Sequence, residues 1–364
     1  FARGADAAGE GEDAPSAPRA NALEQDSVAA ALAQEDLFID DSSDPRLAEI
    51  AAATRVESYM SVPMISDGRL TGFIAAVNSR RKNNPAFSIE QLNRLKLVSG
   101  QVMLARNILD VYDNMSEQQR INQELAFARN LQSSLLPHAF PRWGRFSIHA
   151  ISRASKEVSG DFYDFVEIDK DRLLVVIGDA CGKGIPACMI MAMTRSFIRA
   201  NVPRFTTLKD LLHELNDNLY RDMGDGRYIT LAICLLDKRQ STVEYARAGH
   251  TELLMYVHNH IRSINPNGSG LGLLPSDLTD FDTIKLQFYP QMEFLMFTDG
   301  INESENKKGE LFGVDRIKEV FLKSGLDKDP PHDTCNRIMG AVDDFSQRPN
   351  SEGDDQTVVI VTHL

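Results

Sequence analysis

Cysteine is scarce in this sequence, and long apolar runs are missing. Its 364 residues include four cysteines, none at the Cys-x-x-Cys or Cys/His spacing of a zinc site. Isolated cysteines of this kind are typical of free thiols in a reducing compartment. No window approaches the roughly 18 consecutive apolar residues that a membrane helix needs, and no secretory signal is visible. These absences predict a cytoplasmic protein with no membrane partner.

Positive charge is also in short supply. The chain carries 39 Lys and Arg residues against 52 Asp and Glu residues, a formal net charge of -13. A nucleic-acid site would need a local basic patch, and Arg80–Lys82 and Lys307–Lys308 are too short to form one. We therefore expect no nucleic-acid partner. The length favours two to three domains, and 43% hydrophobic residues is an ordinary globular composition.

The N-terminal part predicts a small domain behind a flexible end. Residues 1–20 are rich in Ala, Gly, Pro, Asp and Glu without periodicity, which indicates a flexible or disordered segment. Further on, strand-like runs at Tyr59–Met64 and Leu70–Val77 flank an Asp-Gly turn and predict a hairpin. Ser88 with Gln91 forms a capping box, which predicts a helix from there to beyond Leu109.

Between Val28 and Leu109, the segments VPM, GRLTGFIAAVN and FSIEQLNRLKLVSGQVMLARNI resemble the C-terminal half of a GAF domain. The resemblance implies a sensory α/β domain over residues 21–109, which lacks the front of a complete GAF domain unless residues 1–20 belong to it. Two interpretations stay open for it: a sensor of a small-molecule or protein signal, and a structural or dimerising module. No ligand-contacting residue can be nominated.

Residues 110–137 predict a helical linker. The stretch Leu104–Leu136 contains no Gly and no Pro, and its apolar residues alternate steps of four and three, as in a coiled-coil seam: Leu104, Ile108, Val111 and Met115. The spacing breaks across Ser116–Arg120, and Pro137 ends the helix. We expect a homodimer through Leu104–Leu136. The alternative is a spacer helix that packs on one domain.

Residues 138–364 predict an α+β domain. Short strand-like runs with turn signals alternate with amphipathic helical stretches at Ile185–Asn201, Leu208–Asp222, Gly313–Ser324 and Pro331–Phe345. Many antiparallel strands with few helices favour an antiparallel two-sheet sandwich flanked by helices.

Aspartates recur at the ends of the apolar strands in this domain. Asp161 opens an aromatic strand, Asp179 follows the run Leu173–Ile177, and Asp299 and Asp354 have matching contexts much later in the chain. A single Asp before a Gly-rich turn is an ordinary turn former. Four in similar positions indicate a site for hard divalent cations, which prefer oxygen ligands.

At this point the sequence resembles the PPM class of metal-dependent Ser/Thr protein phosphatases, in the bacterial branch of SpoIIE and RsbU. The resemblance covers Glu124–Leu364 and rests on segments in family order: ELAFARNLQSSLLP, VSGDFYDF, IGDACGKGIPA, YITLAICLLD, YARAGH, GLGLLP, FTDGINES, LFG and DDQTVVIV. It implies a PPM phosphatase fold over residues 138–364.

The same resemblance implies two bound ions, Mn²⁺ or Mg²⁺. Asp299 and Asp354 would bind the first ion and Asp161 the second, while Asp179 would bridge both, with the Ala180 carbonyl beside it. Two such ions activate a shared water for attack on phosphorus. The implied substrate is a phosphorylated protein, commonly a STAS-type anti-sigma-factor antagonist, with activity regulated through the sensory domain and linker.

Several features qualify this interpretation. Ser159 stands where the branch has the first Gly of a pair, and Lys156 is the nearest basic residue to a missing phosphate-binding Arg. His250 is expected to be a buried hydrogen-bonding residue rather than a base. Two rival functions stay open: a metal-dependent hydrolase of nucleotides or another small phosphoester, and a non-catalytic signalling or binding module.

Overall fold

The computed structural model describes residues 37–39, 59–66, 69–77, 87–141, 143–224, 226–347 and 353–364. The chain divides into two compact units, residues 1–120 and 121–364. The division falls within helix α3 (Ile89–Leu135), directly after the segment where the apolar spacing breaks. The flexible segment predicted at residues 1–20 and the turn at Asp67–Gly68 lie outside the described residues.

The N-terminal unit contains an antiparallel sheet in the order β1-β2-β3, formed by β1 (Leu37–Ile39), β2 (Tyr59–Ser66) and β3 (Arg69–Val77). The predicted hairpin is the pair β2–β3. Helix α3 begins as the capping box predicts, because Ser88 N donates to Gln91 Oε1 at 2.8 Å and Gln91 N donates to Ser88 Oγ at 3.3 Å. It runs for 47 residues, yet no helix in the described ranges is apolar enough over a membrane-spanning length.

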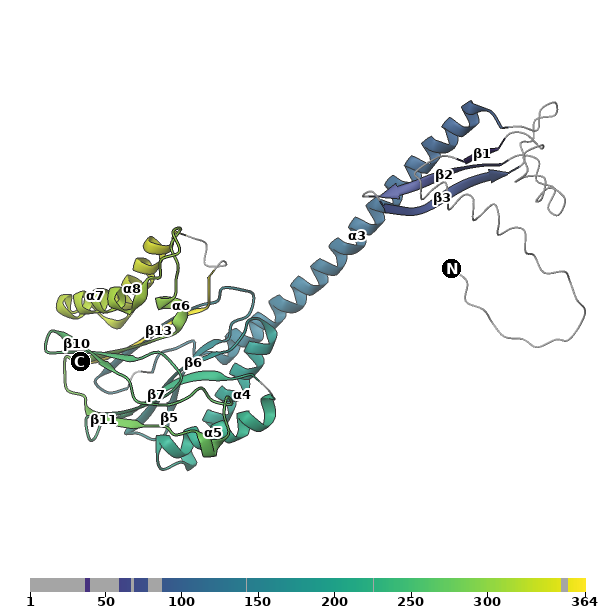
Figure 1. The fold of residues 1–364 in the computed structure, drawn as a ribbon. Helices are drawn as coiled ribbons and strands as arrows, with labels where there is room; N and C mark the ends of the chain where they lie inside the picture. Colours follow the sequence, from purple (N-terminus) through teal and green to yellow (C-terminus); the bar gives the residue numbers. More distant parts are fainter. Residues whose placement is uncertain are drawn as a thin grey trace, which may run out of the picture. The chain divides into compact units, whose positions relative to one another are not determined.

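The C-terminal unit confirms the predicted sandwich of two antiparallel sheets (Figure 1). One sheet has the order β10-β9-β12-β13-β4, with β10 (His260–Ile264), β9 (Leu253–Val257), β12 (Glu293–Phe297), β13 (Gln356–His363) and β4 (Phe146–Arg153). The other has the order β11-β8-β7-β6-β5, with β11 (Thr283–Gln287), β8 (Thr242–Ala248), β7 (Ile229–Asp237), β6 (Arg172–Ala180) and β5 (Asp161–Glu167).

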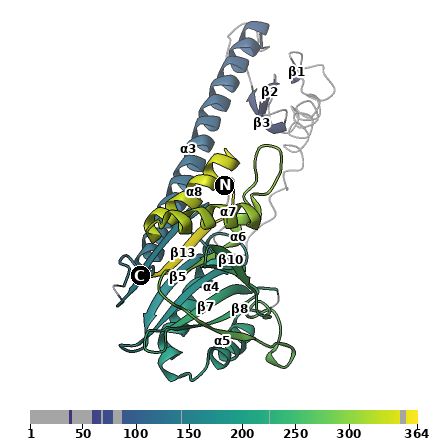
Figure 2. The same ribbon diagram turned by 90° about the vertical axis from the view of Figure 1, so that its left-hand side faces the viewer.

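Helices cover both outer faces of this sandwich, as Figure 2 shows. The pair α7 (Gly313–Asp327) and α8 (Pro331–Ser346) packs on the sheet that contains β13, and the pair α4 (Ile185–Asn201) and α5 (Leu208–Met223) packs on the sheet that contains β6. Short helices complete the unit: η1 (Val202–Arg204), η2 (Ser276–Leu278) and α6 (Asp299–Asn302).

The middle of each central strand is apolar because both of its faces are buried. In β6, Leu174 and Val176 face the α4–α5 layer. The alternating residues Leu173, Val175 and Ile177 face the other sheet. In β13, Val358 and Ile360 likewise face the α7–α8 layer, and the residues between them face the second sheet. This double burial fixes the strand register and therefore where each terminal aspartate lies.

Strand β10 and helix α6 are among the elements that were not predicted from the sequence. Strand β10 is an exposed edge strand with mostly polar residues, so it lacks an apolar signal. Helix α6 has four residues and begins at Asp299, which therefore starts a helical turn directly after β12 and Thr298.

Candidate metal centre

Asp161 and Asp179 come together through strand pairing. Asp161 begins β5 and lies directly opposite Asp179 of β6 in the antiparallel register. The Oδ2 atom of Asp161 accepts hydrogen bonds of 2.7 Å from the hydroxyls of Thr298 and Thr357. Both threonines belong to the other sheet's strand ends, so this buried carboxyl joins the two sheets at one edge of the sandwich.

Asp299 and Asp354 reach the same edge from β12 and β13. These strands pair in antiparallel fashion, and Thr298 N donates to the Thr357 carbonyl at 3.0 Å, so the C-terminal end of β12 meets the N-terminal end of β13. Asp299 is the first residue of α6, and Asp354 lies two positions before the first residue of β13, Gln356. The structure thus brings all four aspartates singled out in the sequence to one place.

The raised pKa values of three of these aspartates indicate that the carboxyl groups lie close to one another. Burial raises the pKa of Asp179 to about 8, and the negative charges of Asp299 and Asp354 add to the rise. Burial also raises the pKa of Asp161 well above its usual range, with Asp179 as the next cause. The pKa of Asp299 is raised by burial and by Asp354. Carboxyls that disfavour each other's charge in this way favour a bound cation.

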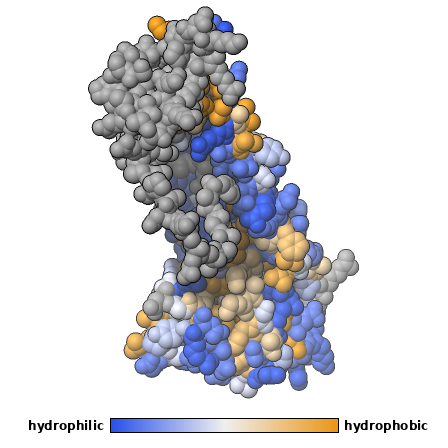
Figure 3. Space-filling model, turned by 90° about the vertical axis from the view of Figure 1, so that its right-hand side faces the viewer, coloured by the Kyte–Doolittle hydropathy of each residue, from blue (hydrophilic) through white to orange (hydrophobic). Residues whose placement is uncertain are grey.

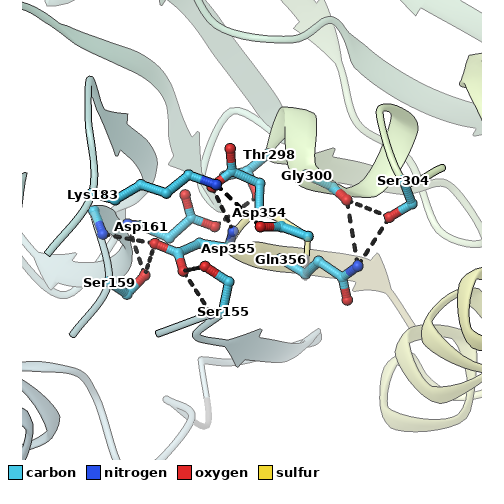
Figure 4. Close-up of polar contacts among 12 residues, drawn as sticks. Ser155, Ser159, Asp161, Lys183, Thr298, Gly300, Ser304, Asp354, Asp355 and Gln356 are labelled. Atoms are coloured by element: carbon cyan, nitrogen blue, oxygen red, sulfur yellow. Dashed lines mark hydrogen bonds and ion pairs between the residues drawn. The ribbon is translucent and has the colours of Figure 1, made fainter. Parts of the chain in front are cut away.

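Asp355 is a site residue that the sequence analysis did not single out (Figure 4). Its Oδ1 accepts from the Ser155 backbone N–H at 2.7 Å and from the Ser155 hydroxyl at 3.0 Å. Its Oδ2 accepts from the Ser159 hydroxyl at 2.7 Å and from Gly160 N at 2.8 Å. With four donors on its two oxygens, Asp355 fixes the loop before Asp161 rather than presenting a free ligand. An Asp-Asp pair in a sequence does not reveal this division of roles.

Lys183 is the cation that the fold places beside this cluster. Its Nζ lies 3.2 Å from Asp354 Oδ1 and donates to the Gly353 carbonyl at 3.0 Å. Lys156, the basic residue nominated from the sequence, is exposed on the loop that Asp355 binds. The Gly-Lys-Gly turn after β6 therefore holds the segment before β13 in place.

Two glycines permit the close approach of the strands. A Cβ atom on Gly160 would lie 2.7 Å from the carbonyl oxygen of Ala180, the backbone group that the family resemblance places beside the metals. A Cβ atom on Gly300 would lie 1.9 Å from the carbonyl oxygen of Asp355. Side chains at these positions would push Asp161 away from β6 and Asp299 away from β13.

The residue types at this site fit a pair of hard divalent ions. Their side chains are not arranged around a single point as metal ligands are. In the described part of the chain, no three Asp, Glu, His or Cys side chains already form a metal-binding cluster. The donor set consists of carboxylate oxygens, as Mg²⁺ and Mn²⁺ require. Asp161 Oδ1 is buried without a hydrogen-bond partner among the described residues, and a cation would satisfy it.

His250 is a buried structural residue, as expected. Its Nδ1 lies 2.8 Å from the Thr230 hydroxyl, and burial lowers its pKa to about 3, with Arg247 adding to the effect. The pKa keeps this histidine neutral at physiological pH. Its partner Thr230 lies opposite Asp179 in the pairing of β7 with β6, so His250 supports the packing of these strands. It is not placed to exchange a proton with solvent.

The end of α3 is joined to the carboxylate cluster through Gln132. This side chain is buried, donates from Nε2 to the Ser159 carbonyl at 2.6 Å and accepts from Ser159 N at 3.0 Å. The hydroxyl of Ser159 in turn bonds Asp355 and accepts from Asp161 N at 3.0 Å. Ser159, which departs from the branch's usual Gly, thus adds a link between helix and site. No pattern in the helix sequence marks Gln132.

Two face-to-face antiparallel sheets, a helix pair on each outer face and aspartates gathered at one edge define a PP2C-like fold. The solved SiaA-PP2C domain of Pseudomonas aeruginosa matches it with a TM-score of 0.60 at 18% identity, over 68% of this chain and 98% of that domain. The family model of Stage II sporulation protein E (SpoIIE) matches residues 169–364, more than half of the 364 residues. The chain belongs to the SpoIIE family.

Curated relatives match slightly more than half of the chain. The phosphoserine phosphatase RsbU of Bacillus subtilis is 31% identical over 205 residues, which cover 56% of this chain and 60% of RsbU. Protein IcfG of Synechocystis is 26% identical over 226 residues, which cover 54% of this chain and 35% of IcfG. The chain thus spans about a third to three fifths of the length of these relatives.

The N-terminal part matches a GAF domain model over residues 4–105. The match confirms the GAF resemblance and begins within residues 1–20, to which the sequence analysis assigned no structure. The SpoIIE match begins after Asp161, so the place of this residue in the site follows from strand pairing and hydrogen bonds.

Proposed function

We propose that this chain is a protein serine/threonine phosphatase that hydrolyses phosphoserine or phosphothreonine on a protein, with two Mn²⁺ or Mg²⁺ ions. The observation that carries the proposal is the convergence of Asp161, Asp179, Asp299 and Asp354 from both sheets. The ions, when bound, activate a water molecule and neutralise phosphoryl charge.

The chain's own residues hold this site in shape. Asp179 lies between the other carboxyls and is the residue best placed to contact both ions. Asp355 fixes the loop that leads to Asp161, and Lys183 holds Asp354 through an ion pair. The aspartates that would hold the ions are therefore supported by hydrogen bonds and an ion pair from their neighbours, as precise metal sites require.

The substrate is proposed to be a small STAS-type anti-sigma-factor antagonist in the cytoplasm. Support comes from the family and from RsbU, whose name states phosphoserine phosphatase activity. The test is phosphate release with Mn²⁺ from a phosphoserine STAS-domain protein, from nucleotides and from p-nitrophenyl phosphate. We expect the phosphoprotein to have the highest kcat/KM. A higher value for a nucleotide would favour the small-phosphoester hydrolase instead.

Asp179→Asn tests the catalytic role of the aspartates. We expect phosphate release to fall by more than about 100-fold, because one carboxylate that serves both ions is lost. Asp344→Asn is the matched control, since Asp344 is exposed on α8. Full activity in Asp179→Asn would reject the assignment. If the wild type binds Mn²⁺ in calorimetry but releases no phosphate from any substrate, the chain is a non-catalytic binding module.

Regulation through the linker is proposed to act at the Gln132–Ser159 contact. An apolar pocket of about 220 Å³ separates the end of α3 from α4, lined by Leu131, Leu135 and Met189 among others. The helix end is thus held by two polar bonds beside a gap, so it can shift against α4. A shift of α3 would move Ser159 and, through Asp355, the loop before Asp161.

The test replaces Gln132 by Leu, with Gln123→Leu on the exposed side of the same helix as control. We expect Gln132→Leu to change the Mn²⁺ affinity and kcat together, by about tenfold, and the control to change neither. Unaltered Mn²⁺ affinity in Gln132→Leu would separate the linker from the metal centre.

A homodimer through α3 is proposed on the exposure of its apolar seam. Leu104, Ile108, Val111 and Met115 are each 58–62% exposed. Apolar residues gathered in this way on a helix favour burial against a second helix. Figure 3 shows orange, apolar atoms among blue, hydrophilic ones on the face that it draws. Light scattering should give a dimer mass, and Ile108→Glu should give a monomer. A wild-type monomer at micromolar concentration would contradict this.

A further inference from the structure

The C-terminal unit has a cavity of about 500 Å³ that the phosphatase site does not use. It lies at the ends of β12 and β13 opposite to the aspartates, because Glu293 and Thr362 line it, whereas Asp299 and Asp354 flank the other strand ends. Its roof is the turn between α7 and α8, the helix pair that covers this sheet in Figure 2. Cavities of this size hold small organic molecules.

Strand register places a polar row on the cavity floor. Glu293 of β12 lies opposite Tyr256 of β9 and opposite Thr362 of β13, and Thr362 lies opposite Ser147 of β4. Directly opposed residues of neighbouring strands project from the same face, so all four side chains share one face of the sheet. The ring of Tyr256 packs beneath Gly325, where a Cβ atom would lie 2.5 Å from it.

Glu293 is buried, with 5% of its surface exposed. Its Oε2 atom accepts no hydrogen bond from the described residues. No Lys, Arg or His of the described ranges forms an ion pair with it. The hydroxyl of Thr362, on the same floor, also has no partner there. Buried polar atoms without partners are rare and costly in folded proteins.

A second carboxylate increases the negative charge near the cavity. Asp329 lines the cavity from the α7–α8 turn, and it adds to the effect of burial in raising the pKa of Glu293 to about 7. Arg337 lies 2.9 Å from Asp329 and 2.8 Å from Asp327, so its guanidinium is engaged by these two carboxylates. Glu293 receives no share of that positive charge.

The remaining walls are mixed, because polar residues that include His258, Lys328 and His363 line the cavity beside apolar and aromatic ones. Tyr256, Tyr289, Met292, Leu326 and Pro330 all line the cavity. Aromatic faces attract organic cations, and the apolar walls would bury a hydrocarbon body. The cavity therefore offers a carboxylate for a charged head and an apolar surface for the rest of a molecule.

We propose that this cavity is a binding site for a small organic cation, an amine or amidinium on an aromatic or aliphatic body, with Glu293 as the group that binds the positive charge. The cation would donate a hydrogen bond to the carboxyl group of Glu293, which lines the cavity. The site is separate from the aspartates, so its ligand is not the phosphorylated substrate.

The test uses the full chain and two probes of equal shape, 2-phenylethylamine and 2-phenylethanol. Saturation-transfer NMR and a thermal shift titration would measure binding to the wild type, to Glu293→Gln and to the exposed control Glu319→Gln. Glu293→Gln keeps the shape of the side chain and removes its charge. We expect the amine to bind wild type and control at least tenfold more tightly than the alcohol, and this preference to vanish in Glu293→Gln.

Three results would overturn the proposal. One is absence of amine binding to the wild type at 20 mM, and the second is equal binding of amine and alcohol. The third is amine binding that survives in Glu293→Gln but is lost in Asp179→Asn, which would place the amine at the aspartate cluster. Phosphate release is not used as a readout, so failure here leaves the proposed phosphatase function unaffected.

Discussion

Buried carboxyl groups lie at both ends of the strand pair β12–β13, but their surroundings differ. At the end that contains Asp299, the buried Asp161 accepts two hydroxyl hydrogen bonds on one oxygen, and Asp355 accepts four on its two. At the other end, Oε2 of Glu293 accepts none from the described residues. The exposed fractions of these residues are alike: 1% for Asp161, 7% for Asp355 and 5% for Glu293.

Burial alone therefore does not distinguish a carboxyl of the candidate metal centre from any other. At the aspartate end, donors from both sheets hold the carboxyls in fixed positions, which is what a metal centre needs. At the Glu293 end, the carboxyl lines a cavity, and its Oε2 atom has no hydrogen-bond partner among the described residues. The two ends therefore differ in the hydrogen bonds that their buried carboxyls accept, and not in how deeply these carboxyls are buried.

The largest effect is expected from Gly300→Ala, which breaks the aspartate end. The added Cβ would meet the Asp355 carbonyl oxygen at 1.9 Å, so α6 and β13 must separate. We expect a loss of about 3 kcal/mol or more in the free energy of unfolding, and loss of Mn²⁺ binding. Chemical denaturation and calorimetry measure these two quantities.

Gly340→Ala serves as the matched control. It lies within α8, and a Cβ there would meet nothing within 4 Å. Alanine in a helix interior should stabilise the protein by about 0.5–1 kcal/mol. If both variants had the same stability, the close approach at Gly300 would not matter.

Glu293 should make stability depend on pH. Burial and Asp329 raise its pKa from 4.5 to about 7 in the folded state, so the folded protein holds the proton more tightly than the unfolded chain. Stability from this group is complete below pH 4.5 and is lost as the pH rises through 7. Relative to Glu293→Gln, the wild type should lose about 3 kcal/mol between pH 4.5 and pH 8.

Denaturation of both proteins across this pH range measures the difference, because all other groups titrate alike in the two. The transition of the C-terminal unit is the one to follow, since two units need not unfold together. Parallel pH curves for wild type and Glu293→Gln would show that Glu293 is not perturbed by folding.

Asp355→Asn should weaken metal binding without removing a proposed ligand. The amide can offer only one oxygen, and its NH₂ group would face donors from Ser155 or from Ser159 and Gly160. We expect Mn²⁺ affinity to fall by about 10–100-fold, as for other supporting residues of metal sites. Calorimetric titration measures it, with Asp344→Asn as the control; equal affinities would remove Asp355 from the support of the site.

The smallest effects compare two threonines of β13. Thr357 donates to Asp161 at one end, whereas the hydroxyl of Thr362 has no partner in the described part of the chain at the other. Thr357→Val should cost about 1–3 kcal/mol, because the buried Asp161 carboxyl loses a hydrogen-bond donor. Thr362→Val should be neutral or stabilising, within about 1 kcal/mol. The reverse order in thermal denaturation would contradict the assigned hydrogen bonds.

Much of the fold follows from patterns that the sequence carries locally. The helical stretches at Ile185–Asn201 and Leu208–Asp222 lie where α4 and α5 are found, because their apolar spacing matches a helix with one buried face. The cap at Ser88 starts α3 through bonds between neighbouring residues. The sequence did not predict strand β10, because an exposed edge strand needs no apolar pattern.

The site divides in the same way. The sequence by itself determined which aspartates end apolar strands, because strand ends and turns are local features, and it determined the family through its ordered motifs. Only the tertiary structure decided that Asp355 supports the loop before Asp161 and that Gln132 joins α3 to Ser159. It also decided that Glu293 lines a cavity with an oxygen that accepts no hydrogen bond from the described residues. Each of these depends on contacts between segments far apart in the chain. Such contacts arise from sheet pairing and helix packing and leave no local signature in the sequence.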